Sequence, residues 1–264
     1  MRIYTASAPG KVILLGEHAV NRRQAALATA VNLRVLCTVN VRHDDVYSFR
    51  FGTLESTTTR SEMERFRQEV DSCRESGDHE GLRARTAGDF FAPTRYALAR
   101  LAERAALPGL DAEWRSELPV GSGLGSGAAA SASLLQAVSD ASGVALSPRQ
   151  VAELAWHGDI VAHGGVASGL DSGASALGGL TLYSLQYGPR VLSDVAAPAL
   201  VIGDTGVQAH TREVNSRVRA LLAAHPARAH LFREIGLLVE EAVRALALGN
   251  METLGGLLNL NQLV

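Results

Sequence analysis

Residues 119–130 read Pro-Val-Gly-Ser-Gly-Leu-Gly-Ser-Gly-Ala-Ala-Ala, with four glycines at alternate positions directly before a run of small helix-forming residues. Glycine allows the backbone to turn its N–H groups toward one point. A helix predicted at residues 128–141, ending at the cap Gly143, would direct its positive N-terminal end at the same point. The segment therefore predicts a loop that binds a phosphate chain.

Three alternative roles for this loop fit its residues less well. A Walker A motif is excluded because no Gly-Lys-Ser/Thr closes the run. Residues 123–128 match the loose dinucleotide pattern G-x-G-x-x-A, but that pattern opens a βαβ unit, and here a second helix follows the first. A flexible Gly/Ser linker is disfavoured because the run passes directly into an alanine-rich helix.

The overall composition is that of an ordinary globular chain. Its 264 residues are 47% hydrophobic and 20% charged, and the net charge of −2 indicates no basic surface for nucleic acid. The two cysteines form neither a zinc motif nor a disulfide framework. No window approaches about 18 uninterrupted apolar residues, and charged residues stand where a signal peptide would be apolar. We expect a cytoplasmic protein with no nucleic-acid or membrane partner.

Short apolar runs that alternate with polar residues predict strands. We expect strands at residues 3–7, 12–15, 33–41, 46–51, 114–118, 180–184 and 199–203. Pro9-Gly10 is expected to separate the first two strands. The strand at 46–51 is expected to pair with the strand at 33–41 across His43-Asp44-Asp45.

Longer runs with capping residues predict helices at residues 61–74, 93–106, 128–141, 148–164, 211–224 and 227–248. Ser147-Pro148-Arg149-Gln150 supplies an N-cap, a proline at the first helical position and a capping-box glutamine. Strands and helices that alternate in blocks indicate an α+β chain in two lobes. We expect the lobes to be residues 1–190 and 191–264, with the break near residues 185–198.

Lys11 is the only lysine among 25 basic residues. A lysine ammonium is compact, whereas an arginine guanidinium is a wide fork that is always charged, so the two do not substitute for each other at a crowded site. Composition alone gives drift equal weight. The setting of Lys11, directly after Ala8-Pro9-Gly10 and before an apolar run, favours a functional role.

Two carboxylates and two histidines gather in residues 156–171. Asp171 follows a glycine-flanked turn, which would present its carboxylate close to a ligand. His157 and His163 stand six positions apart, so they do not share a helical face, and a zinc pair is disfavoured. We interpret His157 as a structural histidine. No Gly-x-Ser-x-Gly occurs, so a hydrolase nucleophile elbow is not supported.

Taken together, four segments resemble the motifs of the GHMP small-molecule kinases. Residues 9–20 are similar to PGKVILxGEHAVV, residues 116–129 to SxLPxGxGLGSSAA, and residues 163–171 to HGxPSGxD. Residues 204–214 are similar to DTGxxxxTxxxV, a segment of the microbial mevalonate kinases. The resemblance is therefore strongest to the mevalonate kinases. It implies a two-lobed fold whose N-terminal lobe resembles domain 2 of ribosomal protein S5, followed by an α/β C-terminal lobe.

The resemblance also implies roles for individual residues. Asp171 would be the base that takes the proton from the acceptor hydroxyl, and Lys11 would stand beside it. ATP would be bound by Ser116 and by the loop residues Gly121, Ser122, Gly123, Leu124, Gly125, Ser126 and Gly127. The acceptor would be bound by Glu17, His18, Ser168, Gly169 and Thr205. Mg²⁺ would be held by Asp159, where the family has Glu, and by Ser126.

The sequence departs from the family pattern at several positions. Gly127 replaces the second serine of the loop, which is the usual magnesium ligand. Asp159 is one methylene shorter than Glu. The segment from His163 to Asp171 has one residue more than HGxPSGxD and lacks its proline. The late glycine-rich motif of the family does not occur, so we expect the C-terminal lobe to be incomplete.

The sequence thus predicts an ATP- and Mg²⁺-dependent kinase that phosphorylates mevalonate at its 5-hydroxyl by direct in-line transfer. Another small alcohol, such as phosphomevalonate, homoserine or a sugar, is the alternative within the family. A catalytically impaired nucleotide- or metabolite-binding protein is the alternative outside it. We expect a monomer or a homodimer.

Overall fold

A computed structural model describes residues 2–119, 121–195, 197–203, 205–206 and 211–264. Among these residues, one seven-stranded sheet has the order β4-β3-β5-β2-β6-β7, with β1 paired to β2. The strands are β1 (Ile3–Leu15), β2 (Ala26–Val41), β3 (Val46–Phe51), β4 (Leu54–Thr59), β5 (Leu110–Ser116), β6 (Leu180–Ser184) and β7 (Gly188–Val191).

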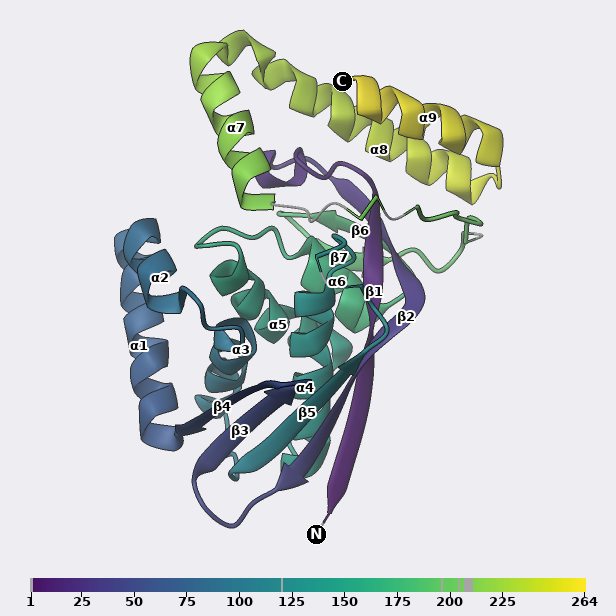
Figure 1. Ribbon diagram of the computed structural model, residues 1–264. Helices are drawn as coiled ribbons and strands as arrows, with labels where there is room; N and C mark the ends of the chain where they lie inside the picture. The colour runs from purple at the N-terminus through teal and green to yellow at the C-terminus, as the bar shows by residue number, and fades with distance from the viewer. Residues whose placement is uncertain (1, 120, 196, 204, 207–210) are drawn as a thin grey trace.

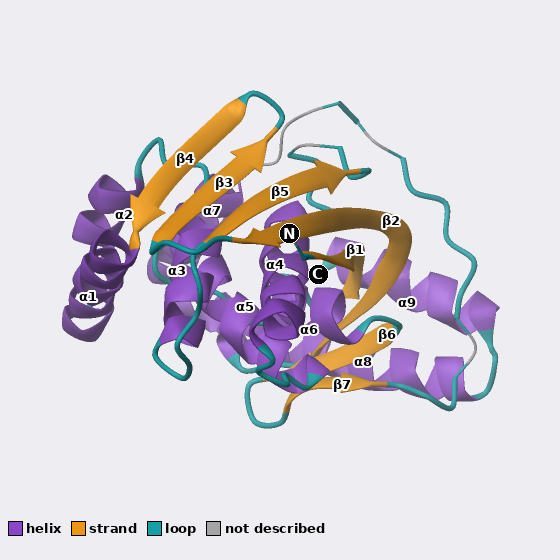
Figure 2. Cartoon of the chain, turned by 90° about the horizontal axis from the view of Figure 1, so that it is seen from below, coloured by secondary structure: helices purple, strands orange, loops and turns teal. Residues whose placement is uncertain are grey.

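Helices connect and cover these strands. They are α1 (Arg60–Ser76), α2 (His79–Thr86), α3 (Ala92–Ala102), α4 (Ser126–Ser142), α5 (Pro148–Ala162), α6 (Leu170–Leu177), α7 (Thr211–Ala224), α8 (Leu231–Ala247) and α9 (Met251–Leu263). Figure 2 shows α3, α4 and α5 packed on one face of the sheet. In Figure 1, α8 and α9 lie side by side beyond the C-terminal end of β1 and the N-terminal end of β2. The α+β class is confirmed.

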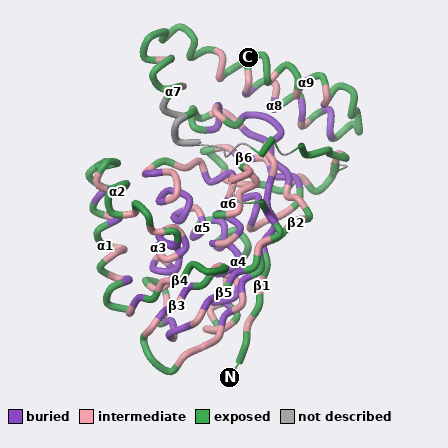
Figure 3. The backbone as a smooth tube through the Cα atoms, in the orientation of Figure 1, coloured by how far each residue is buried: buried purple, intermediate pink, exposed green. Residues whose placement is uncertain are grey.

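The main core lies between the sheet and the helices α3–α5, where buried backbone concentrates in Figure 3. Val35, Cys37 and Val39 of β2 are at most 2% exposed, while Leu36 between them is 38% exposed. This alternation confirms the predicted one-sided burial of the strand. A second cluster joins Leu14, Leu15 and Leu27 to α8 and α9.

Local capping signals in the sequence agree with the observed helix ends. Thr59 and Glu62 form a capping box at the start of α1, and Ser147 and Gln150 form another at the start of α5. Gly143 ends α4 in the left-handed conformation with φ 71°. The predicted caps at Ser147 and Gly143 are confirmed, because a cap depends on neighbouring residues only, whereas the capping box at Thr59 was not predicted.

Two predictions about the strands were wrong. Pro9-Gly10 does not break the first strand: β1 is continuous, with register shifts between Pro9 and Lys11 and between Ile13 and Leu15. Proline is tolerated there because β1 is an edge strand and need not donate on its free side. β3 does not pair with β2, because β5 lies between them, parallel to β3 and antiparallel to β2.

Other elements were missed or misplaced. Residues 199–203 form no strand; β7 is instead the partner of β6. The short elements β4, α2 and α6 were not expected, and neither was α9, a helix of 13 residues. β7 spans residue 190, where the lobe boundary was expected, and the division into lobes stays a prediction.

Candidate active site

The glycine loop is held against β1 by backbone contacts. The N–H of Lys11 donates to the carbonyl of Leu124 at 2.9 Å. Gly10 leaves no space between the two segments, since a Cβ there would lie 2.5 Å from Leu118 Cδ2 and 2.8 Å from the Leu124 oxygen. The glycine before Lys11 therefore permits the close approach of the strand to the loop.

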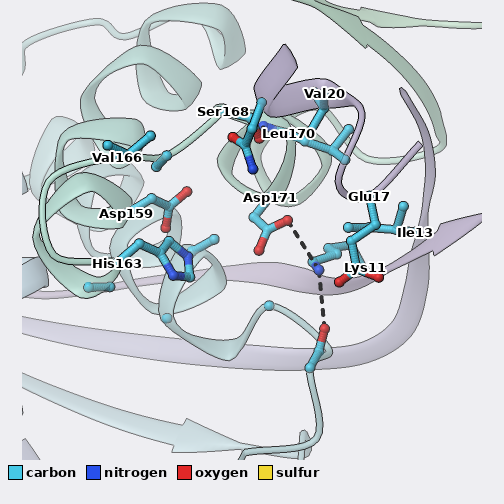
Figure 4. Close-up of a pocket in the computed structure, with 18 of the residues that line it drawn as sticks. Lys11, Ile13, Glu17, Val20, Asp159, His163, Val166, Ser168, Leu170 and Asp171 are labelled. Atoms are coloured by element: carbon cyan, nitrogen blue, oxygen red, sulfur yellow. Dashed lines mark hydrogen bonds and ion pairs between the residues drawn. The ribbon is translucent and has the colours of Figure 1, made fainter. Parts of the chain in front are cut away.

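Lys11 connects this loop to Asp171 (Figure 4). Its Nζ lies 3.1 Å from Asp171 Oδ1 and donates to the carbonyl of Gly123 at 3.1 Å. Lys11 is only 5% exposed. A Cβ at Gly125 would lie 3.0 Å from Lys11 Cγ and Cε, so the loop backbone packs directly on the lysine stem. The ammonium is held in one narrow position.

Asp171 stands in the first turn of α6 rather than on a free turn, which corrects the expectation from the sequence. Gly169 precedes the helix with φ 89°, a conformation that favours glycine. Ser168 Oγ accepts a hydrogen bond from the N–H of Leu170 at 3.2 Å. Asp171 therefore lies at the positive end of the α6 dipole.

Asp159 supplies a second carboxylate from the last turn of α5. It is 4% exposed, and its Oδ2 has no hydrogen-bond partner among the described residues. Burial and the nearby charge of Asp171 raise the pKa of Asp159 above its usual value, while hydrogen bonds from Ser172 and the charge of Lys11 act in the opposite direction. Figure 4 shows Asp159 and Asp171 both projecting into the same cavity.

This carboxylate pair fits a divalent cation. A buried carboxylate oxygen without a partner is costly unless a cation or donor satisfies it. Within the described ranges no group of three or more His, Cys, Asp and Glu side chains could enclose a metal. Mg²⁺ needs no such cage, because it retains waters and takes phosphate oxygens as ligands.

The cavity around these groups measures about 280 Å³. It collects most of the residues predicted from the sequence: Lys11, Glu17, His18, Gly121, Gly123, Gly125, Ser126, Gly127, Asp159, Ser168, Gly169 and Asp171. We call it the charged cavity. Its residues come from β1, the glycine loop, α5 and the segment before α6, which the fold brings together.

A second, apolar cavity of about 140 Å³ adjoins the charged one. Ser126 and Gly127 line both cavities. The apolar cavity is formed mainly by aromatic side chains, among them Phe51, Phe90, Phe91 and Trp114. The rings of Phe51 and Phe90 stack with centroids 5.5 Å apart, and those of Phe91 and Trp114 with centroids 5.9 Å apart.

The remaining predicted residues lie elsewhere. Ser116 lines the apolar cavity. Ser122 and Leu124 belong to the glycine loop but line neither cavity, and neither does Thr205. Asp204 and Val207, which stand next to it in the predicted motif, lie outside the described residues.

Sequence reasoning missed several lining residues. Ile13 was detectable, since it stands two positions after Lys11 on the same face of β1. Val20, Val166 and Leu170 carried no chemical signal. His163 was quoted without an assigned role and lines the charged cavity. His157 does not; it lies 3.2 Å from Arg74 Nη1, and burial with the charges of Arg100 and Arg74 lowers its pKa to about 4.

Comparisons with known proteins agree with this geometry. The model of the GHMP kinases N terminal domain matches residues 93–179. A mevalonate kinase from Thermococcus sibiricus is 30% identical over 264 residues, covering 97% of this chain and 75% of the relative. The chain belongs to the GHMP kinase family.

Other relatives of this GHMP kinase extend the comparison. A mevalonate kinase from Mus musculus is 30% identical over 258 residues, covering 83% of this chain and 63% of the relative. The solved mevalonate kinase of Methanococcus jannaschii superposes with a TM-score of 0.70 at 19% identity, covering 98% of this chain and 77% of that one. A galactokinase from Lactococcus lactis, complexed with galactose, gives a TM-score of 0.69 at 15% identity, covering 98% and 74%. These superpositions show the shared fold.

The family is one of small-molecule kinases, so the chain is an enzyme of that class. In the part of the GHMP kinase that the structure describes, no helix has the length and apolar character needed to cross a bilayer.

Proposed function

We propose that this GHMP kinase transfers the γ-phosphoryl group of ATP to the 5-hydroxyl of mevalonate. The observation that carries the proposal is the Lys11–Asp171 ion pair, which lies beside the glycine loop in the charged cavity. Mevalonate kinases at 30% identity support the choice of acceptor.

The two adjoining cavities suit the two parts of a nucleotide. The apolar cavity, which Phe91 and Trp114 help to line, would hold the adenine ring among aromatic side chains. Ser126 and Gly127 border both cavities. With the base in the apolar cavity, the triphosphate on the ribose would pass these two residues and enter the charged cavity. There the loop N–H groups and the N-terminus of α4 would bind the phosphate oxygens.

Asp171 would act as the base. It accepts the proton of the acceptor hydroxyl as the hydroxyl oxygen bonds to the γ-phosphorus and the bond to the ADP oxygen breaks. Lys11 holds the Asp171 carboxylate at 3.1 Å and neutralises charge that gathers near the γ-phosphate. Because Lys11 also donates to the carbonyl of Gly123, it would hold Asp171 and the glycine loop at a fixed distance from each other.

The residues that would hold Mg²⁺ are Asp159 and Ser126, which both line the charged cavity. The bound ion would neutralise phosphate charge and link it to the protein. The partnerless Oδ2 of Asp159 supports this assignment. Gly127 removes the second serine of the family loop, so this chain offers one hydroxyl fewer there.

The acceptor would lie against Glu17, His18, Ser168 and Gly169, which also line the charged cavity. His18 is suited to the mevalonate carboxylate, since a protonated or neutral imidazole donates to carboxylate oxygens. Thr205 is part of the same proposal through its motif.

The first test measures ADP release from MgATP with mevalonate, and separately with phosphomevalonate, homoserine and galactose. Turnover with mevalonate alone supports the proposal, while turnover with another alcohol only would move the substrate. ATP binding without turnover on any of them would favour an impaired binding protein, the alternative that Gly127 motivates. Asp171→Asn should lower kcat by about 10²- to 10⁴-fold, the usual contribution of a general base. Near-wild-type activity in that variant would refute the assignment of the base.

A further inference from the structure

One wall of the charged cavity is the segment 163–169, which links α5 to α6. Trp156 of α5 reaches this segment from behind: its Nε1 donates to the carbonyl of Ala167 at 2.9 Å. Ala167 lines the charged cavity, whereas Trp156 does not; Trp156 lines a separate groove on the other side of the segment. The indole therefore supports the wall without touching the space inside it.

Trp156 also contacts the segment where it turns into α6. A Cβ at Gly169 would lie 3.3 Å from Trp156 Cδ1 and 3.1 Å from Tyr183 Oη. The Gly169 backbone is thus packed between two aromatic side chains, one from α5 and one from β6. Gly169 is the N-cap of α6, two positions before Asp171.

These contacts connect the Trp156 side chain both to the cavity surface at Ala167 and to the start of α6 at Gly169. Through Ala167, Trp156 fixes the surface that the acceptor would meet, and through Gly169 it fixes the start of the helix that carries Asp171. Asp159 stands on the same helix as Trp156, three positions later. Trp156 therefore contacts the start of the helix that carries Asp171 from the helix that carries Asp159.

We propose that Trp156 is a positioning residue that holds Asp171 and the acceptor wall in the geometry for phosphoryl transfer. The identity of the acceptor in this statement rests on the proposed function. The role of Trp156 in placing segment 163–169 and α6 does not depend on the identity of the acceptor.

The chain offers a matched control, because it contains two tryptophans and both indoles donate to a backbone carbonyl. Trp114 Nε1 donates to Ala130 at 3.1 Å, and Trp114 lines the apolar cavity instead. Trp156→Phe should lower kcat by about tenfold to a hundredfold and raise KM for the acceptor, with KM for ATP unchanged, since a misplaced reacting group costs this much. Trp114→Phe should instead raise KM for ATP.

A structural role alone would act differently. It would lower the melting temperature and the folded fraction, and it would leave kcat per folded enzyme and the acceptor KM unchanged. An unchanged acceptor KM and kcat in Trp156→Phe, or equal increases of both KM values, would overturn the proposal.

A second measurement needs no substrate. Amide hydrogen exchange followed by mass spectrometry should speed up in peptides covering residues 163–171 of Trp156→Phe, while peptides covering residues 121–128 should exchange as in the wild type. Unchanged exchange at 163–171 would contradict the positioning role whatever the acceptor. Absence of mevalonate turnover in the wild type, with faster exchange at 163–171 in the variant, would refute the proposed substrate and leave the role of Trp156 intact.

Discussion

At the scale of single residues, Lys11 is distinguished by its confinement. The ammonium has Asp171 Oδ1 and the Gly123 carbonyl at 3.1 Å, and the backbone of Gly125 packs on its stem. A guanidinium is planar and wider than an ammonium, and it cannot occupy the same position without moving the loop. The lone lysine of an arginine-rich chain thus lies where arginine does not fit.

Lys11→Arg keeps the positive charge and should nevertheless lower kcat by about a hundredfold, equivalent to about 2.7 kcal/mol of transition-state stabilisation. The reason is displacement of Asp171 and of the glycine loop by the larger head group. Steady-state kinetics of the purified variant give the measurement. Arg50→Lys is the control, since Arg50 pairs with Glu55 at the surface and its side chain is 53% exposed. If Lys11→Arg and Arg50→Lys were equally active, Lys11 would have no special role.

At the scale of elements, the glycine loop and the first turn of α4 contain glycines of two kinds. Gly121, Gly123 and Gly125 have φ between 73° and 76°, where side chains are strained. Gly127 is helical, and a Cβ there would meet no atom within 4 Å. The backbone conformation at positions 121, 123 and 125 favours glycine, whereas the fold does not require glycine at position 127.

Gly127→Ser should therefore be accepted and should return a hydroxyl to the site. We expect a lower Mg²⁺ concentration for half-maximal turnover, and a free energy of unfolding higher by a few tenths of a kcal/mol, about the difference in helix propensity between Ser and Gly. A Mg²⁺ titration of the initial rate and a urea melt measure both effects.

Gly123→Ser is the matched control for this variant. Its Cβ would also meet no atom within 4 Å, but φ is +76°, so the side chain costs about 1–2 kcal/mol in backbone strain. Gly123→Ser should lower activity and stability. Equal behaviour of the two variants would show that backbone conformation does not separate these glycines.

At the scale of the whole molecule, α8 and α9 pack on the ends of the strands that carry the site. Leu246 of α8 is 1% exposed and belongs to the same apolar cluster as Leu14 and Leu15 of β1. Lys11 stands on the same strand, just before Leu14 in the sequence. Loss of packing under α8 would therefore be transmitted to the strand that holds Lys11.

Leu246→Ala should lower the free energy of unfolding by about 2–5 kcal/mol, as usual for a buried leucine. Both tryptophans lie in residues 1–190, so their fluorescence reports that part of the chain. We expect the fluorescence transition in urea to shift together with the circular dichroism transition. Leu248→Ala, at an 82% exposed position, should shift neither. If the urea midpoint of the fluorescence transition were unchanged in Leu246→Ala, the two predicted lobes would unfold independently.

Much of the local structure was predictable, and the arrangement of the strands was less so. Ser147 and Gly143 were decisive because caps involve residues a few positions apart. The pairing of β3 was mispredicted because β5, which enters the sheet after three intervening helices, takes the place beside β2. Chain proximity favours the hairpin, whereas the observed order depends on a strand that is distant in the sequence.

The sequence by itself determined which groups are available at the site: a glycine loop before a helix, one lysine, Asp171 in a segment that resembles a family motif, and Asp159 shortly before that segment. Only the tertiary structure decided that Lys11 also donates to Gly123, that Asp159 is buried with an Oδ2 that has no partner among the described residues, and that Trp156 supports segment 163–169. The physical reason is range. Backbone preferences act between neighbours, whereas desolvation and close packing depend on segments that meet only in the folded chain.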